Sequence, residues 1–249
     1  MKNILSKIYF HPIFLIIVLI FILIGRFKFI IYFMLLIIVH ELGHILVSLF
    51  FKWKIDKIII LPFGCLTKYN EIINRPLKEE LLVSISGILF PLIFYKIMHQ
   101  YIDYNYFTFI NYFIIIFNLL PIYPLDGSKI LNVFFNKITT FKNSILLSII
   151  ISYLCIIILS FLLFYINILF FLMFIFLFNE VNKYYNEREL LFNKFLLERY
   201  LNNLKFKKEK IITNVDKMKK DYRHVFYIGN KYMTENTLLK KMFDINGNL

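Results

Sequence analysis

The chain contains no alanine and few charged residues, which make up 18% of its 249 positions. A soluble domain carries about 25% charged and about 45–50% apolar residues, whereas 59% of this chain is hydrophobic. The excess lies in long unbroken apolar runs, which are typical of membrane spans. Composition therefore excludes an ordinary soluble domain and predicts a membrane protein that crosses the bilayer several times.

Cysteine and acidic residues are also scarce. The two cysteines, Cys65 and Cys155, fall in an expected loop and in an apolar run, so neither a disulfide framework nor a cysteine metal site is expected. There are 16 acidic residues against 29 Lys and Arg, a formal net charge of +13. We attribute this charge to basic cytoplasmic loops rather than to a nucleic-acid partner. The lipid bilayer is the expected environment.

The apolar runs predict an all-α polytopic membrane protein with six transmembrane helices, a short membrane-associated loop or hairpin after the second helix, and a small cytoplasmic α/β tail. Pro121 and Pro124 end the fourth span, because proline cannot continue the helical hydrogen bonds. The spans make residues 1–178 an intramembrane domain. Their expected ranges are Ile8–Gly25, Phe27–Phe51, Glu80–Met98, Tyr106–Leu120, Ser144–Phe164 and Ile166–Phe178.

The distribution of basic residues predicts the orientation of these spans. With both termini in the cytoplasm, 26 of the 29 Lys and Arg residues lie inside and three lie outside. Cytoplasmic loops of membrane proteins carry such an excess. Residues 179–204 are expected to form an amphipathic linker helix and residues 205–249 a small tail. Within the tail, Arg223–Ile228 is expected to be a strand and Asn236–Phe243 a helix.

One apolar run holds the motif His40-Glu41-Leu42-Gly43-His44. On a helix, His40 and His44 lie one turn apart on one face and can bind one Zn²⁺ together. Glu41 projects to the side, where it can take a proton from a bound water. The alternative is a pair of hydrogen-bonded buried histidines beside a neutralised Glu41. In lipid this is unfavourable, because a carboxylate at the bilayer centre costs about 2.5–3.5 kcal/mol, and a divalent cation would offset that cost.

A catalytic zinc site usually has three protein ligands and a water. The only other well-placed carboxylate near the spans is Asp126, which follows Pro121 and Pro124, where kinked backbone can line a cavity. His40 and His44 lie about 20 Å and about 26 Å along an inward-running span, at 1.5 Å per residue. The fourth span also runs inward. All three side chains are therefore expected in the cytoplasmic third of the bilayer.

The histidine motif and the run from Asn118 to Gly127 together resemble the paired motifs of the site-2 protease family of intramembrane zinc metalloproteases. The chain is similar to the sporulation branch of this family in four features. These are the Leu61-Pro62-Phe63-Gly64 loop, the six expected spans, the lack of room for a PDZ domain and the cytoplasmic tail. The resemblance covers residues 1 to about 180.

This resemblance implies roles for five side chains. His40, His44 and Asp126 would be the ligands of one Zn²⁺. Glu41 would be the general base and acid of peptide hydrolysis, and Asn118 would help to position the substrate.

The resemblance also implies a biological setting. The expected substrate is a membrane-associated precursor of the sporulation factor sigma-K, cleaved on the cytoplasmic side in regulated intramembrane proteolysis. The mother-cell membrane around the forespore is the expected location, and inhibitory membrane proteins are expected partners. Relatives in the sporulation branch end in a CBS-like nucleotide-sensing domain. Residues 205–249 could be a reduced CBS-like module that binds ATP.

Other functions stay open at this point. The protease could have a different membrane substrate, or the chain could be a non-catalytic membrane metal-binding regulator. A zinc transporter would also place His and Asp inside spans, but it needs a polar pathway through the whole membrane, and the outer half of these spans has almost no polar groups. Glu41→Gln separates these functions, because Glu41 is expected to act as a base and not as a ligand.

Overall fold

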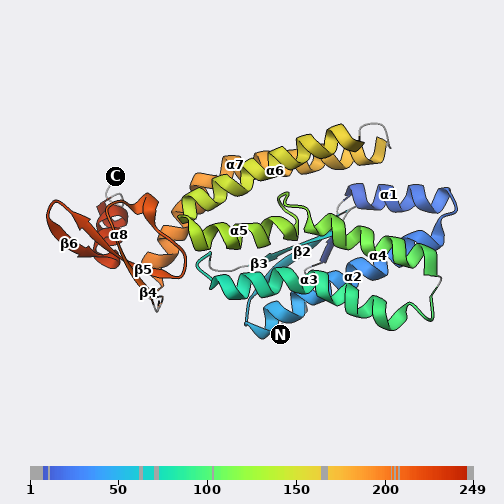
Figure 1. The fold of residues 1–249 in the computed structure, drawn as a ribbon, viewed down its shortest axis with the longest axis horizontal. Coiled ribbons are helices and arrows are strands. Elements are labelled where there is room, and N and C mark those ends of the chain that lie inside the picture. Colours follow the sequence, from blue (N-terminus) through green and yellow to red (C-terminus); the bar gives the residue numbers. More distant parts are fainter. Residues whose placement is uncertain are drawn as a thin grey trace. The chain divides into compact units, whose positions relative to one another are not determined.

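The computed structural model describes residues 8–10, 12–61, 64–69, 73–102, 104–163, 168–202, 204, 206 and 208–245. The chain divides into two compact units, whose elements are labelled in Figure 1. The first unit comprises Met1–Glu71 and Leu81–Lys129, and the second comprises Ile72–Glu80 and Ile130–Leu249. Each unit is described by itself below.

In the first unit, helix α2 (Phe27–Phe50) packs against helix α4 (Tyr104–Leu119). The apolar core positions recur every three or four residues, which is the spacing that places side chains on one face of a helix. With 24 residues, α2 is about 36 Å long, enough to cross a bilayer core. The core residues are Ile30, Phe33, Leu36 and Ile37 of α2 and Phe107, Ile110 and Ile114 of α4.

Three of the described helices are long and apolar enough to cross a membrane: α2, α3 (Leu77–Met98) and α6 (Phe141–Leu163). Helix α1 (Pro12–Leu23) and α4 are shorter apolar helices. The expected start of the first span at Ile8 is wrong, because Ile8–Phe10 is strand β1 and the helix begins at Pro12, a residue favoured in a first helical turn. The count of six spans and their orientation remain predictions.

A three-stranded sheet in the first unit includes the segment that follows α2. Strands β2 (Ile55–Leu61) and β3 (Gly64–Tyr69) form an antiparallel hairpin, and β1 pairs in parallel with β2, Ile8 opposite Ile58. The strand order is β1-β2-β3, so β3 lies at an edge. The consecutive isoleucines of β2 favour a strand. The expected hairpin is confirmed, and its membrane association remains a prediction. Pro62 and Phe63 lie outside the described residues.

Helix α5 (Asp126–Ile138) occupies a region where the sequence analysis predicts no helix. It is short and amphipathic, with Val133 buried and Lys137 exposed, so no long apolar run marks it. In the second unit, its Asn132 donates an Nδ2 hydrogen bond to Ser148 Oγ of α6 at 3.0 Å. The expected break at Pro121 and Pro124 is confirmed, because residues 120–125 lie outside any helix, and Asp126 begins α5 directly after them.

Helices α6 and α7 (Ile168–Leu201) pack side by side in the second unit (Figure 1). The rings of Phe141 and Phe195 are stacked with their centroids 4.2 Å apart, and the Tyr153 hydroxyl donates to Asn182 Oδ1. Helix α7 is continuous over 34 residues. From Ile168 to Leu201 the expected sixth span and the expected linker helix therefore form one helix, since no proline or glycine separates them. Residues 166 and 167 of that span and residue 203 of the linker lie outside the described residues.

The tail is a small sheet with one helix. Strands β4 (Lys208–Ile212), β5 (Tyr222–Ile228) and β6 (Lys231–Thr234) lie in that order, parallel for the first pair and antiparallel for the second. A short 3-10 helix, η2 (Val215–Lys217), precedes β5, and α8 (Glu235–Ile245) follows β6. The expected strand and helix of the tail are thereby confirmed.

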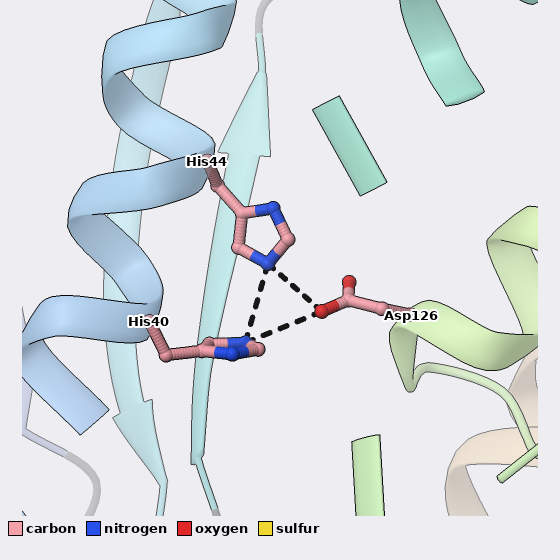
Figure 2. A group of neighbouring side chains, drawn as sticks. All are labelled: His40, His44 and Asp126. Carbon is pink, nitrogen blue, oxygen red and sulfur yellow. Dashed lines mark hydrogen bonds and ion pairs between the residues drawn. The ribbon is translucent and has the colours of Figure 1, made fainter. Parts of the chain in front are cut away.

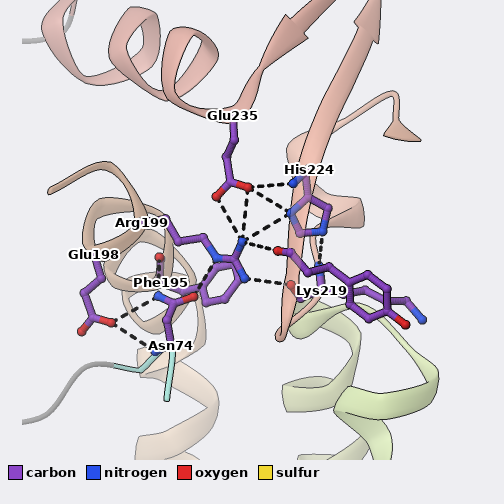
Figure 3. A network of polar contacts seen from close by, with 8 residues as sticks. Asn74, Phe195, Glu198, Arg199, Lys219, His224 and Glu235 are labelled. Atoms are coloured by element: carbon purple, nitrogen blue, oxygen red, sulfur yellow. Dashed lines mark hydrogen bonds and ion pairs between the residues drawn. The ribbon is translucent and has the colours of Figure 1, made fainter. Parts of the chain in front are cut away.

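Arg199, near the end of α7, holds the tail through a buried polar network (Figure 3). Its guanidinium donates to Asn74 Oδ1 at 2.7 Å, to Glu235 Oε1 at 3.1 Å and to the carbonyl oxygens of Lys219 and Tyr222 at 2.9 and 2.8 Å. Its side chain is 1% exposed. Buried charges persist where they are paired and hydrogen-bonded, as this one is. The network joins the tail, α7 and the segment before α3 within the second unit.

Candidate metal centre

Helix α2 places His40 and His44 on one face, one turn apart. Both are buried, 3% and 5% exposed, although α2 is otherwise mostly apolar. Their Nε2 atoms lie 3.2 Å apart, and the ring planes are almost perpendicular at 87°. Both rings therefore present the same nitrogen to one point beside the helix.

The third side chain comes from α5. Leu125 and Ile122 form a tight turn after α4, and α5 then begins at Asp126. Gly127 makes this connection possible, because a Cβ at its position would lie 2.1 Å from the carbonyl oxygen of Leu119. The close approach of α5 to the end of α4 places Asp126, 3% exposed, opposite the histidine face.

Three donor atoms converge in this way, as Figure 2 shows. Asp126 Oδ2 lies 2.8 Å from His44 Nε2 and 3.2 Å from His40 Nε2. Ligand atoms held about 2.0–2.2 Å from one tetrahedral zinc ion would be about 3.3 Å apart. The two 3.2 Å edges of the observed triangle match this spacing, and the 2.8 Å edge between His44 and Asp126 is shorter. Two imidazole nitrogens and one carboxylate oxygen are also a ligand set that zinc accepts at catalytic sites.

A hydrogen bond fixes the orientation of His44. Its Nδ1 lies 2.7 Å from the carbonyl oxygen of Val83 in α3. A carbonyl only accepts, so Nδ1 carries a proton, and in the neutral ring Nε2 is then the unprotonated nitrogen, which faces Asp126 and His40. Metal-binding histidines usually have such a partner behind them.

Glycines let α3 approach the histidine rings. A Cβ on Gly87 would lie 2.2 Å from His44 Nε2 and 2.9 Å from His40 Cε1, so only glycine leaves room for both rings. A Cβ on Gly43 would lie 2.5 Å from the carbonyl oxygen of Ser86, so α2 and α3 are in close backbone contact there. Small residues at such a crossing allow membrane helices to pack closely. Neither glycine was predicted to shape the site, although small residues stand out in these bulky helices.

Glu41 and Asn118 differ in their surroundings. Glu41 is 4% exposed, and neither of its carboxylate oxygens has a hydrogen-bond partner among the described residues. Asn118 is 6% exposed and donates its Nδ2 to the carbonyl oxygen of Ile114, one turn earlier in its own helix. The structure thus brings His40, His44 and Asp126 together, and it gives Asn118 a contact within α4.

Residues 28–105 and 98–162 match the sequence profile of Peptidase family M50. The chain belongs to this family. Stage IV sporulation protein FB of Bacillus subtilis is 34% identical over 210 residues, which are 80% of this chain and 73% of that protein. A zinc metalloprotease of Methanocaldococcus jannaschii is 32% identical over 112 residues, which are 41% of this chain and 32% of that protein.

The fold agrees with this assignment. The solved structure of a site-2 protease from Methanocaldococcus jannaschii superposes with a TM-score of 0.58 at 26% identity, covering 71% of this chain and 89% of that chain. The profile match includes α2, α5 and the converging triad. As a member of peptidase family M50, the chain is a metalloendopeptidase of the site-2 type.

Proposed function

We propose that this M50 peptidase uses one zinc ion, bound by His40, His44 and Asp126, to cleave a membrane-associated protein on the cytoplasmic side of the bilayer. The observation that carries the proposal is the convergence of two Nε2 atoms and one carboxylate oxygen within 3.2 Å of one another in a buried site. Three ligands leave a tetrahedral ion one free position.

The chain's own residues supply the remaining parts of peptide hydrolysis. A zinc ion bound at the triad would polarise the scissile carbonyl and lower the pKa of a nearby water. Glu41, which follows His40 directly and has no hydrogen-bond partner among the described residues, accepts the water proton on a carboxylate oxygen. It then returns a proton to the nitrogen of the leaving amine. Asn118 is proposed to position the substrate through its carboxamide, because the bond to the carbonyl oxygen of Ile114 uses only one of its two N–H groups.

The substrate must present an extended backbone, because a helix hides its carbonyls in hydrogen bonds. Strand β3 lies at the edge of the first unit's sheet and packs against α2, the helix that carries both histidines. An edge strand offers unpaired backbone groups to an extended peptide. We propose that β3 receives the unwound substrate segment, with the hairpin associated with the membrane.

The sporulation relative supports a more specific setting. The proposed substrate is the precursor of sigma-K, the proposed location is the mother-cell membrane around the forespore, and both termini are proposed to lie in the cytoplasm. Inhibitory membrane partners and ATP binding by the tail remain predictions that follow from the resemblance alone.

Co-expression tests this function. The full chain and the Glu41→Gln variant are each produced with the sigma-K precursor, and cleavage is followed by the size of the product. Purified protein is assayed for bound zinc in parallel. We expect Glu41→Gln to abolish cleavage and to keep zinc, since the residue acts on protons and is not a ligand. Glu187→Gln, at an exposed carboxylate of α7, is the matched control and should cleave normally.

The outcome separates the remaining candidates. Unchanged cleavage by Glu41→Gln would refute the protease mechanism. A zinc transporter predicts zinc movement across vesicles that is insensitive to Glu41→Gln, and a non-catalytic regulator predicts no cleavage by the wild type. Cleavage of a different membrane protein, but not of the sigma-K precursor, would keep the mechanism and reject the substrate.

A further inference from the structure

The two oxygens of Asp126 face different partners. Oδ2 faces the two histidine nitrogens, at 2.8 Å from His44 and 3.2 Å from His40. Oδ1 instead accepts a hydrogen bond from Lys129 Nζ at 2.8 Å. The two carboxylate oxygens of Asp126 therefore have different partners, since one faces the two histidine nitrogens and the other is bonded to an ammonium group.

The contact between Lys129 and Asp126 follows from their spacing in the sequence. Lys129 stands three residues after Asp126 on α5, so the two side chains lie on the same face of the helix. An ion pair at this spacing contributes little when both groups are in water. Here the Asp126 side chain is 4% exposed, whereas that of Lys129 is 44% exposed. The Lys129 ammonium is thus held against a buried carboxylate, although the lysine side chain as a whole is partly exposed.

A carboxylate can bind a metal through one oxygen or through both. If Asp126 used both, it would occupy the position that a tetrahedral ion keeps for water or substrate. The hydrogen bond to Lys129 holds Oδ1 against the ammonium group, while Oδ2 faces the two histidine nitrogens. Partners of this kind orient metal ligands, and their removal typically lowers metal affinity or activity by about 10–100-fold.

We propose that Lys129 is a positioning residue that holds Asp126 as a one-oxygen ligand and so keeps one metal position open. This inference rests on the proposed zinc site. Lys129 acts through Asp126 and is not itself a ligand, since its ammonium would be repelled by the ion. The two possible roles of Lys129 therefore have opposite effects on zinc affinity. A residue that only adds positive charge would weaken zinc binding, whereas a positioning residue strengthens it.

The test compares zinc binding by the full-length wild type, Lys129→Met and Lys129→Arg, each purified in detergent. Zinc affinity is measured by competition with a chromogenic chelator. We expect Lys129→Met to bind zinc about 10–100-fold more weakly. Lys129→Arg, which retains a charged donor, should recover most of the affinity. Lys137→Met, in the last turn of the same helix, is the matched control and should bind as the wild type does.

A spectrum provides a second readout that a purely structural role would not change. With Co²⁺ in place of zinc, a four-coordinate site absorbs visible light more strongly than a five- or six-coordinate site. We expect Lys129→Met to weaken and shift this band, because Asp126 can then bind with both oxygens, and Lys129→Arg to restore it. If Lys129→Met does not fold, Lys129→Ala is measured instead.

The possible results decide separately between this inference and the proposed function. Equal or tighter zinc binding by Lys129→Met, with an unchanged Co²⁺ band, would overturn the positioning role while leaving the zinc protease intact. A wild-type protein that binds no zinc would instead reject the proposed function itself.

Discussion

The Nδ1 atom of His44 lies 2.7 Å from the carbonyl oxygen of Val83, so one turn of α3 orients a ring that belongs to α2. The next turn of α3 carries Gly87, whose missing side chain leaves the space that the His44 and His40 rings occupy. Helix α3 thus both fixes the histidine tautomer and forms the wall behind the triad.

The contact of Gly87 with the histidine rings predicts that Gly87→Ala strongly impairs zinc binding and cleavage. The new Cβ would lie 2.2 Å from His44 Nε2, so the ring must move away from Asp126. We expect loss of stoichiometric zinc and of cleavage, measured by metal analysis and by the co-expression assay. Leu89→Ala, at an exposed position of the same helix, should keep both. Normal zinc content in Gly87→Ala would contradict this prediction and would show that α3 can shift to accommodate the new methyl group.

A second prediction concerns the third ligand. Asp126→Asn keeps the shape of the side chain but replaces the anionic oxygen with a neutral amide, leaving two histidines as the remaining good zinc ligands. It also deprives Lys129 of its charge partner. We expect a larger loss of zinc affinity than for any substitution of Lys129, measured in the same chelator competition. Affinity equal to that of the wild type would exclude Asp126 as a ligand.

A third prediction tests the turn that delivers this ligand. In Gly127→Ala the new Cβ would lie 2.1 Å from the carbonyl oxygen of Leu119, and backbone cannot move aside as a flexible side chain can. Overpacking of this kind costs about 1–3 kcal/mol of folding free energy. We expect a lower thermal transition in detergent together with weaker zinc binding. Ser128→Ala, the neighbouring position, loses one hydrogen bond to Leu125 and serves as the control.

The metal centre divides into parts that the sequence predicts and parts that it does not. The His40–His44 pair is set by helical spacing alone, and Asp126 stands out as a carboxylate near apolar runs. These residues were predicted to meet, and the structure places their donor atoms together. The contacts of Val83 and Gly87 depend on which face α3 presents to α2, and this is decided by tertiary packing rather than by any local pattern. The Lys129–Asp126 pair is local, but it requires helix α5, which was not predicted.

The fold shows the same division. Long apolar helices such as α2 and α6 were predicted because length and hydropathy suffice to mark them. Helix α5 was missed because its polar and apolar residues are mixed. Strand β1 was missed because its three residues were counted with the apolar run of α1, although His11 and Pro12 stand between them. The partner of Arg199 in the chain, Glu235, is 36 residues away, so no spacing rule could identify it.

A fourth prediction follows from that buried pair. Removing one member of a buried ion pair costs about 3–5 kcal/mol, because the other charge is left without compensation. Arg199→Met would leave the buried charge of Glu235 without its partner and would remove the hydrogen bonds to Asn74 and Tyr222. We expect the tail to become sensitive to limited proteolysis, while Arg188→Met, at the surface of the same helix, leaves it resistant. A tail that stays resistant in both variants would mean that the apolar contacts alone hold it.

The last prediction concerns the pH dependence of the tail. Burial lowers the pKa of His224, and the nearby charges of Arg199 and Lys210 lower it further, against the opposing effect of Glu235. In the unfolded chain this imidazole takes up a proton as the pH falls past about 6.5, whereas in the fold it stays neutral to lower pH. The unfolded tail then binds more protons, so its free energy of unfolding decreases as the pH falls below about 6.5.

Glu235 extends the same trend to lower pH. Burial by itself would raise its pKa, but the hydrogen bonds from His224 and the charge of Arg199 outweigh burial and hold the pKa below the usual range. Its stabilising contribution is therefore present at neutral pH and is lost as the pH falls through that lowered value. Hydrogen exchange of the buried Phe226 amide, corrected for intrinsic rates, measures the His224 step between pH 7 and pH 5. We expect protection to decrease from pH 7 to pH 5 in the wild type and to change less in His224→Gln, whereas His99→Gln should behave as the wild type; an equal slope in all three would exclude His224 as the titrating group.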